Sequence, residues 1–391
     1  MKKAKILFLW LIAAVMLASG CGKSNSDDNA ETSEENFNTE NEVLEEDMAS
    51  EEDREPVSEE PEPEVREIVD GKIRSYFTGE WIDAELGTKR PLAIMLNNTL
   101  EALPMSGPSS ASVIYECPVE GRITRWMGIF EDWENLSRIG SVRSCRLYYL
   151  HFAQEFDSIY AHFGQAPYAL EALNSGEFDV LSGGTKGIEH PVTSMYDRIS
   201  RPGKSREHTL YAFPNGILKD IEKKGYNREM PEDYPGKFKF APTGEIEEYA
   251  GYPDATFLQP GGNGGKNGFG GVKATFEYNA ADRKYYRSSY GNPHMDELTG
   301  EQVAVTNVIF QYCDGGVLDS KDYLHFASQS HNNDCIVFTN GKMIEGYWSN
   351  PGELGTPARY YEDNNQEIVL NNGKTFVCIV WNDYVDDVVI Q

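Results

Sequence analysis

The stretch ASVIYECPVEGRITRWMGIF, residues 111–130, contains two apolar runs that are separated by a break at Glu120-Gly121. The runs 111–115 and 124–130 have the length and the β-branched or aromatic content of buried strands. A third run of this kind, PLAIML, occupies residues 91–96. The sequence therefore predicts that this part of the chain forms a buried sheet.

Helix signals alternate with these strand signals. Ser144 can cap a helix over Cys145–Phe156, which is apolar on most sides and is expected to pack against the sheet. Residues 157–163 have the composition of a further strand. Two more helices are predicted, at 167–173 and at 215–224, the second one capped by Asn215. This alternation predicts an α/β-like layered domain.

The tail of the chain has a different pattern. Asn340-Gly341 and Asn372-Gly373 each lie between two apolar runs, which is the strongest short-range signal for a β-hairpin. The tail is therefore predicted to be a small β-rich domain. The glycine run 261–271 between the two parts has the composition of a loop or hinge.

These patterns together predict the α+β class, with an α/β-like layered amino-terminal domain and a small β-rich carboxy-terminal domain. The predicted segments are a signal peptide (1–20), an acidic disordered tether (21–68), the α/β domain (69–235), a Gly-rich connecting region (236–300) and the β-rich domain (301–391).

The amino terminus has the three parts of a bacterial export signal. Three lysines precede the apolar run 6–18, which is shorter than the roughly 20 residues of a membrane-spanning helix. The following residues 18–21, ASGC, resemble a lipobox, with Ala18 where Leu is commoner. We expect cleavage before Cys21 and acyl chains such as palmitate on its sulfur, which would anchor the protein on the extracytoplasmic face of the cell membrane. The alternative is an uncleaved anchor, or an ordinary signal with a chance cysteine.

The segment after the signal is strongly acidic. Residues 22–67 carry 19 acidic and three basic side chains, a net charge of −16 out of the −28 of the whole chain. Such a segment buries too little apolar surface to fold, so we expect an extended tether. Because the rest of the chain is acidic as well, its net charge opposes binding to the phosphate backbone of nucleic acid, and nucleic acid is excluded as a partner.

The sequence contains no complete catalytic or metal-binding pattern. Pro260 and Asn267 stand where a phosphate loop needs a glycine and a Ser or Thr. The seven histidines lack the spacing of a metal site, so we expect no metal and no cofactor. Five cysteines remain besides Cys21, and Cys313 with Cys335 is the pair to test for a disulfide. Cys145 is either a small core residue or a thiol whose pKa is lowered by neighbouring arginines.

The densest group of polar residues extends from residue 97 to residue 146. Arginines around the expected helix start make a natural anion site, because free backbone N–H groups and guanidinium groups both point at the ligand. Glu116 and Glu120 offer an acid/base pair. Alternatively, the glutamates and arginines neutralise one another in salt bridges. The candidate ligand-binding residues are Asn97, Asn98, Glu116, Glu120, Arg122, Arg143, Ser144, Arg146, His208 and Tyr211.

Several of these residues belong to motifs that resemble one protein family. The segments RPLAIMLNN (90–98), YECPVEGRITR (115–125), IGSVRSCR (139–146) and HTLY (208–211) resemble the YerB-like lipoproteins. The segments FTNGKMIEGYWS (338–349), ARYY (358–361) and LNNGKT (370–375) resemble the carboxy-terminal domain of that family. The resemblance implies a lipoprotein with the amino-terminal domain of unknown function 3048 followed by its carboxy-terminal domain, and no established reaction. The chain departs from the family pattern at Cys145, where Ala is expected, and at Thr209, where Asn is usual.

The leading functional prediction is a non-enzymatic envelope lipoprotein that binds an anionic ligand, a cell-wall polymer or an envelope protein. One alternative is a cell-envelope hydrolase with Glu116 or Glu120 as its acid/base. Another is a scaffold for a membrane-bound wall-synthesis protein. A binding protein needs only a preformed cleft, whereas a hydrolase needs a carboxyl group of shifted pKa beside a second polar group.

Overall fold

The computed structural model of the protein describes residues 66–184, 186–330, 332–350 and 355–391. The predicted signal peptide, Cys21 and nearly all of the predicted tether lie outside the described residues. All described residues belong to one compact unit.

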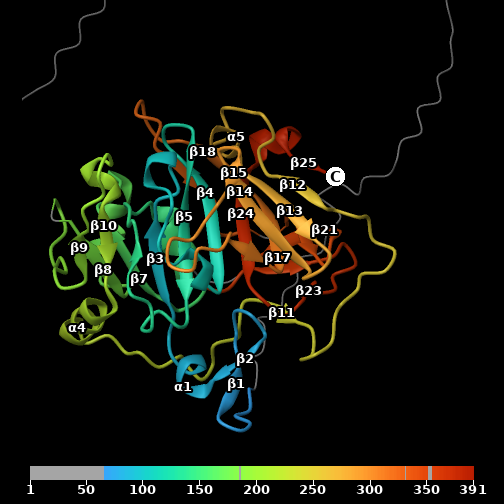
Figure 1. The fold of residues 1–391 in the computed structure, drawn as a ribbon, viewed down its shortest axis with the longest axis horizontal. Coiled ribbons are helices and arrows are strands. Elements are labelled where there is room, and N and C mark those ends of the chain that lie inside the picture. Colours follow the sequence, from blue (N-terminus) through green and yellow to red (C-terminus); the bar gives the residue numbers. More distant parts are fainter. Residues whose placement is uncertain (1–65, 185, 331, 351–354) are drawn as a thin grey trace, which may run out of the picture. The chain divides into compact units, whose positions relative to one another are not determined.

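The centre of this unit is a ten-stranded mixed sheet (Figure 1). Its strands, in spatial order, are β22 (Arg359–Tyr361), β21 (Lys342–Ser349), β20 (Asn333–Thr339), β17 (Asn307–Cys313), β24 (Thr375–Trp381), β4 (Val113–Val119), β5 (Ile123–Phe130), β3 (Leu92–Leu96), β7 (Ile159–Phe163) and β8 (Val180–Gly183). The apolar runs 91–96, 111–115 and 124–130 correspond to β3, β4 and β5, so these predicted strands are confirmed.

Six strands of this sheet form two groups of three parallel neighbours. β17, β24 and β4 pair in parallel, as do β3, β7 and β8. β5 is antiparallel to both β4 and β3, and it therefore joins the two parallel groups. The carboxyl ends of all six parallel strands consequently lie along one edge of the sheet, which we call the carboxyl edge.

The two faces of the sheet are covered differently. Helix α2 (Leu147–Gln154) packs on one face, where its Phe152 stacks on Tyr115 of β4 at 5.2 Å between ring centroids. A six-stranded sheet covers the other face, and its Phe276 contacts Phe376 of β24 edge to face at 5.0 Å. The strands of this second sheet are β12 (Phe257–Gln259), β13 (Thr275–Asn279), β14 (Lys284–Ser289), β15 (Asn292–Pro293), β16 (Ala304–Val305) and β25 (Val389–Ile390).

The remaining elements are short. The small strands are β1 (Lys72–Arg74) with β2 (Trp81–Asp83), β6 (Ile139–Gly140) with β9 (Tyr196–Arg198) and β10 (Leu210–Ala212), β11 (Lys239–Phe240) with β23 (Val369–Leu370), and β18 (Gly315–Val317) with β19 (Leu324–Phe326). The other helices are α1 (Ala84–Gly87), α3 (Leu170–Asn174), α4 (Pro214–Lys224) and α5 (Phe269–Val272), and 3-10 turns include η4 (Pro167–Ala169), η5 (Arg206–His208) and η6 (Asn382–Asp387).

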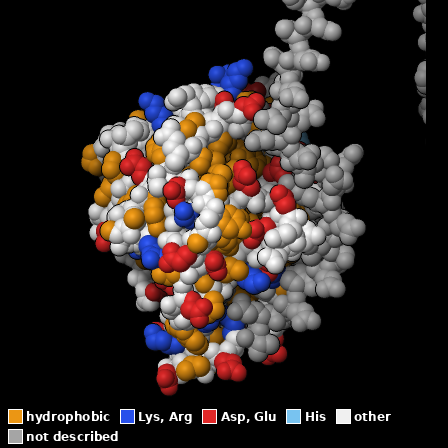
Figure 2. All heavy atoms as spheres, turned by 90° about the vertical axis from the view of Figure 1, so that its right-hand side faces the viewer, with side chains coloured by type: hydrophobic (Ala, Val, Ile, Leu, Met, Phe, Trp, Pro, Cys, Tyr) orange, Lys and Arg blue, Asp and Glu red, His pale blue; other side chains and the backbone are white. Residues whose placement is uncertain are grey.

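The α+β class is confirmed, and five strands of residues 301–391 (β17, β20, β21, β22 and β24) share the central sheet with five strands of residues 69–235. The domain boundaries at 235 and 301 stay a prediction. The face seen in Figure 2 carries acidic and basic side chains scattered among apolar ones.

Two predicted helix starts are wrong. α2 begins at Leu147 and not at Cys145, because the backbone of Arg146 is still extended (φ −123°, ψ 146°). Ser144 therefore does not cap it. α4 is preceded by Phe213 and begins at Pro214, so Asn215 lies inside its first turn, whereas the predicted end at Gly225 (φ 71°) is confirmed.

The two Asn-Gly sites have different outcomes. β20 and β21 form the predicted hairpin, with Thr339 opposite Lys342 and positive φ at Asn340 and Gly341. The hairpin predicted around Asn372-Gly373 is wrong. β23 pairs with β11, and β24 enters the central sheet between β17 and β4.

Candidate functional site

Residues 142–146 lie at the carboxyl edge, between the ends of β3 and β7. The amide of Arg143 donates to the carbonyl of Met95 on β3, at 3.1 Å. The amide of Phe163, at the end of β7, donates to the carbonyl of Arg143, and the amide of Cys145 donates to the carbonyl of Gly164. In open α/β sheets, ligands bind at this edge of the strands. The backbone thus fixes two arginines at the position where such folds place their sites.

Arg146 is bound to Glu120, which follows the end of β4. The Nε of Arg146 donates to Oε2 of Glu120 at 2.9 Å, and its Nη2 makes a second contact with Oε1. Partial burial acts to raise the pKa of Glu120, but the hydrogen bond and the charge of Arg146 outweigh it and hold that pKa below its ordinary value. The pair is a two-point salt bridge at the border of the site.

Arg125 adds a further buried cation to the cluster. Its side chain is 6% exposed, and its Nη1 donates to the carbonyl of Ser144 at 3.0 Å. Burial, together with the charges of Arg146 and Arg143, lowers its pKa to about 9. Among the residues that the structure describes, Arg125 makes no ion pair of its own. The cluster therefore holds excess positive charge.

Arg143 and His208 form the far side of this cluster. Nη1 of Arg143 donates to Oε2 of Glu207 at 3.0 Å. Nδ2 of Asn97 lies 2.9 Å from Nδ1 of His208. Desolvation lowers the pKa of His208, so its ring is neutral near pH 7 and can accept this hydrogen bond. Asn97, Arg143 and His208 thus lie in one group, while Ser144 contributes only its backbone carbonyl.

Glu116 and Asn98 belong to a separate, fully buried cluster between the two sheets. Nη2 of Arg287 on β14 donates to both carboxylate oxygens of Glu116, at 2.7 and 3.0 Å, and neither side chain is exposed. Nδ2 of Asn98 and the hydroxyl of Thr124 also donate to this carboxylate. A carboxylate with these partners and no exposed surface is positioned to join the two sheets, away from the carboxyl-edge cluster.

Tyr211 also lies away from the arginine cluster. It is on β10, opposite Gly140 of β6, and its ring is 5.7 Å from the guanidinium carbon of Arg138. Desolvation raises the pKa of its hydroxyl, and the other charges that act on it are those of Arg201, Glu297 and Arg138.

A pocket of about 290 Å³ adjoins the arginine cluster. The β4–β5 turn supplies Glu120 and Arg122, the glycine run supplies Lys266, and the end of the chain supplies Trp381 and Tyr384. Neither Arg122 nor Lys266 has an ion-pair partner among the described residues. Sequence reasoning missed the last three residues, because they lie more than 140 positions from Arg122 and only the fold brings them together.

The glycine run 261–271 packs closely against the β4–β5 turn because glycines stand at the points of contact. A Cβ on Gly271 would lie 2.2 Å from the carbonyl oxygen of Arg122, and one on Gly268 would lie 2.9 Å from that of Ile123. Asn267 fixes the run by donating to the carbonyl of Gly261 and to the carboxylate of Asp387. The run is therefore a packed wall of the pocket, held by these contacts.

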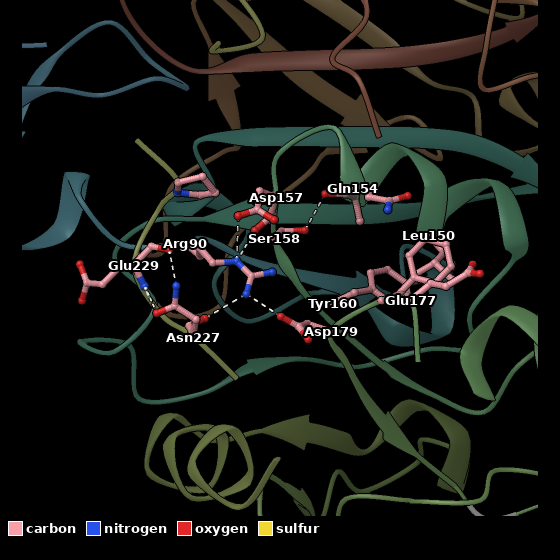
Figure 3. Close-up of a pocket in the computed structure, with 13 residues that line it drawn as sticks. Arg90, Leu150, Gln154, Asp157, Ser158, Tyr160, Glu177, Asp179, Asn227 and Glu229 are labelled. Atoms are coloured by element: carbon pink, nitrogen blue, oxygen red, sulfur yellow. Dashed lines mark hydrogen bonds and ion pairs between the residues drawn. The ribbon is translucent and has the colours of Figure 1, made fainter. Parts of the chain in front are cut away.

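A second pocket, of about 220 Å³, lies at the opposite ends of β3 and β7 (Figure 3). Arg90 points into it and contacts Asp157 at 3.1 Å and Asp179 at 2.5 Å, and it also donates to the carbonyl of Asn227. Two carboxylates neutralise this one guanidinium. The second pocket therefore lacks the excess cations of the carboxyl edge.

The cysteines of the described residues are buried and form no disulfide, so the predicted disulfide between Cys313 and Cys335 is wrong. Strands β17 and β20 pair with Gln311 opposite Cys335. Cys313 lies two residues further along β17, so the two cysteines do not face each other. Burial raises the pKa of Cys145 to about 12 and outweighs the charges of Arg146 and Arg125. The suggestion that arginines lower this pKa is therefore wrong, and Cys145 is a core residue.

No group of three or more His, Cys, Asp or Glu side chains among the described residues is arranged to hold a metal ion. No helix within the same residues has the length and hydropathy needed to cross a membrane.

Comparison with known proteins gives consistent matches. Residues 77–227 match the model described as "Protein of unknown function (DUF3048) N-terminal domain", and residues 268–377 match its C-terminal domain. The Bacillus subtilis (strain 168) protein named "Putative lipoprotein YerB" is 28% identical over 314 residues, which cover 79% of this chain and 86% of that protein. The crystal structure of YerB protein from Bacillus subtilis has a TM-score of 0.66 and 25% identity, and covers 81% of this chain and 99% of that chain.

Proposed function

The chain belongs to the DUF3048 family of proteins of unknown function, and we propose that it is a lipid-anchored, ligand-binding protein of the bacterial cell envelope. The anchor is the lipid on Cys21, and the protein faces the extracytoplasmic side. The name of the Bacillus subtilis relative supports the lipoprotein assignment. The ligand is an anion, and it binds at the carboxyl edge.

The excess of cations at the carboxyl edge carries this proposal. Residues 68–391 have a net charge of −15, yet Arg125, Arg143 and Arg146 lie close enough to perturb one another, with Arg122 in the adjoining pocket. Glu120 and Glu207 neutralise two of these charges. Bringing like charges together costs free energy, and an anionic ligand would offset that cost.

A hydrolase has less support from the same geometry. A general acid needs a raised pKa, whereas Arg146 holds the pKa of Glu120 below its ordinary value. Glu116 has no exposed surface through which substrate can reach it. A scaffolding role for a wall-synthesis protein stays a prediction.

Thermal melts across an anion series test the binding site. Sulfate and phosphate at matched ionic strength should stabilise the wild-type protein relative to chloride, and a ligand at 100 times its dissociation constant adds about 2.7 kcal/mol. Arg122→Ala combined with Arg143→Ala should remove most of this gain. The matched control is Arg228→Ala, which removes an arginine from an ion pair with Glu134 elsewhere. An undiminished anion response in the double variant would refute the site.

The membrane assignment has its own test. Cys21→Ala should release the protein from the membrane fraction and prevent incorporation of labelled fatty acid, because the lipid is the proposed anchor. A Cys21→Ala protein that stays wholly in the membrane pellet would mean that something else anchors it.

A further inference from the structure

The pocket beside Arg122 has an aromatic wall. Trp381 ends β24, Tyr384 follows in η6, and their half-buried rings meet edge to face at 5.3 Å. Leu324 and Val317 of the β18–β19 hairpin line the pocket as well, and Val317 is 55% exposed. Such a wall offers apolar and aromatic surface against which the C–H face of a ligand ring can pack.

The rim of the same pocket carries charges that can be paired with a ligand. Arg122 and Lys266 are exposed cations with no ion pair in the described chain, and they come from segments 144 residues apart in sequence. Asp322, on the opposite hairpin, has an exposed carboxylate, which accepts hydrogen bonds. Apolar wall, cations and acceptor thus surround one space.

The size of the pocket limits the ligand. Its volume of about 290 Å³ is at the small end of the roughly 300–1,000 Å³ that is usual for small-molecule sites. A long polymer segment does not fit inside, whereas a single ring with its substituents does.

We propose that this pocket binds an acidic sugar, meaning one hexose-type ring that carries a carboxylate or a phosphate. The ring lies against Trp381, the acidic group pairs with Arg122 and Lys266, and a ring hydroxyl donates to Asp322. An anion without a ring leaves the aromatic wall unused, and a neutral sugar leaves both cations unpaired. The inference rests on the proposed anion site and specifies the ligand class.

Calorimetric titration of the whole soluble chain, residues 22–391, tests this. The probes are glucuronic acid and glucose 6-phosphate, compared with glucose, which lacks the charge, and with acetate and inorganic phosphate, which lack the ring. At least one acidic sugar should bind ten times more tightly than both its neutral and its ringless counterpart. Comparison of the two acidic probes distinguishes a carboxylate from a phosphate.

Variants assign the binding to the pocket. Trp381→Ala should remove the tenfold advantage of the ring and leave the response to inorganic phosphate intact, while Trp381→Phe should keep part of the advantage. Lys266→Ala, an exposed substitution, should weaken the acidic sugars and leave glucose unchanged. Tyr286→Ala, on the outer face of β14, is the control and should change nothing.

The outcomes separate the two proposals. The sugar assignment is overturned if the acidic sugar and the ringless anion bind with equal affinity. It is also overturned if the tighter binding of the acidic sugar persists in Trp381→Ala. The anion site stands in both cases. Loss of the phosphate response with Arg122→Ala and Arg143→Ala supports the anion site by itself. A phosphate response that survives those two substitutions overturns both.

Discussion

Glu116 and Arg287 illustrate, for single residues, how a polar side chain is retained in the core. The two residues are 171 positions apart, and the fold places them face to face with no exposed area. The sequence offered salt bridging as one alternative for Glu116, but nothing near it in the chain pointed to Arg287. Breaking a buried pair leaves one charge uncompensated, which is far more costly than losing a surface pair.

Glu116→Gln should therefore lower the free energy of unfolding by about 3–5 kcal/mol, because the charge of Arg287 stays buried without a carboxylate. Urea denaturation of the purified protein measures this. The control is Glu248→Gln, which breaks an exposed pair with Arg283 and should leave the unfolding free energy nearly unchanged, because surface ion pairs contribute little. Similar losses in the two variants would contradict the buried pair.

His162 makes stability depend on pH. Its ring is fully buried between the carbonyl of Gly164 and the hydroxyl of Ser182, and burial lowers its pKa to about 4. In the unfolded chain the histidine pKa is about 6.5. Between pH 6.5 and pH 4, His162 is therefore protonated in the unfolded chain and neutral in the folded chain. The contribution of His162 is thus complete above pH 6.5 and is lost as the pH falls to 4.

In His162→Gln this proton linkage is absent. The difference in unfolding free energy between wild type and variant should shrink by up to about 3 kcal/mol from pH 7 to pH 4, since one pKa unit corresponds to 1.36 kcal/mol. Denaturant titrations of both proteins at several pH values provide the comparison, in which other titrating groups cancel. Parallel stability curves would show that His162 is protonated in the folded state.

Secondary-structure elements were predictable where the signal is local. Asn340-Gly341 has the positive φ values that the turn between β20 and β21 needs, so two residues were enough to predict that hairpin. The similar signal at Asn372-Gly373 fails because long-range pairing decides there: β24 is buried between β17 and β4, and β23 pairs with β11. Of the candidate site, the arginines were found from local clustering, whereas Lys266 and Trp381 depend on the fold.

The glycine run offers a test of how an element positions the site. Gly271→Ala should displace the turn that carries Arg122, because the new Cβ would lie 2.2 Å from a backbone oxygen. We expect a loss of about 1–3 kcal/mol in unfolding free energy and a weaker response to phosphate. Gly265→Ala in the same run is the matched control, since a Cβ there has no neighbour within 4 Å. Equal behaviour of the two variants would mean that the run does not support the turn.

At the scale of the whole molecule, one sheet connects the two segments that the family models match separately. β24, which begins inside the second match, pairs in parallel with β4, from the first, with Thr375 opposite Val113 and Val377 opposite Tyr115. The sequence predicted two domains because the strand-helix alternation stops and hairpin signals begin near residue 300. Composition along the chain carries no information on which strands become neighbours, so a shared sheet was beyond prediction.

This pairing predicts how the chain folds. A fragment of residues 69–300 lacks β24 and β17, so β4 would become an unpaired edge, and Trp126 would lose its contact with Phe376. We expect that fragment to show no cooperative thermal transition in calorimetry, and residues 66–391 to unfold in one transition. Separate expression of 69–235 and 301–391, followed by mixing, provides a second arm, in which structure should form only in the mixture. A sharp transition in 69–235 alone would instead establish the domain boundary at 235 and make the shared sheet an interface between two independent units.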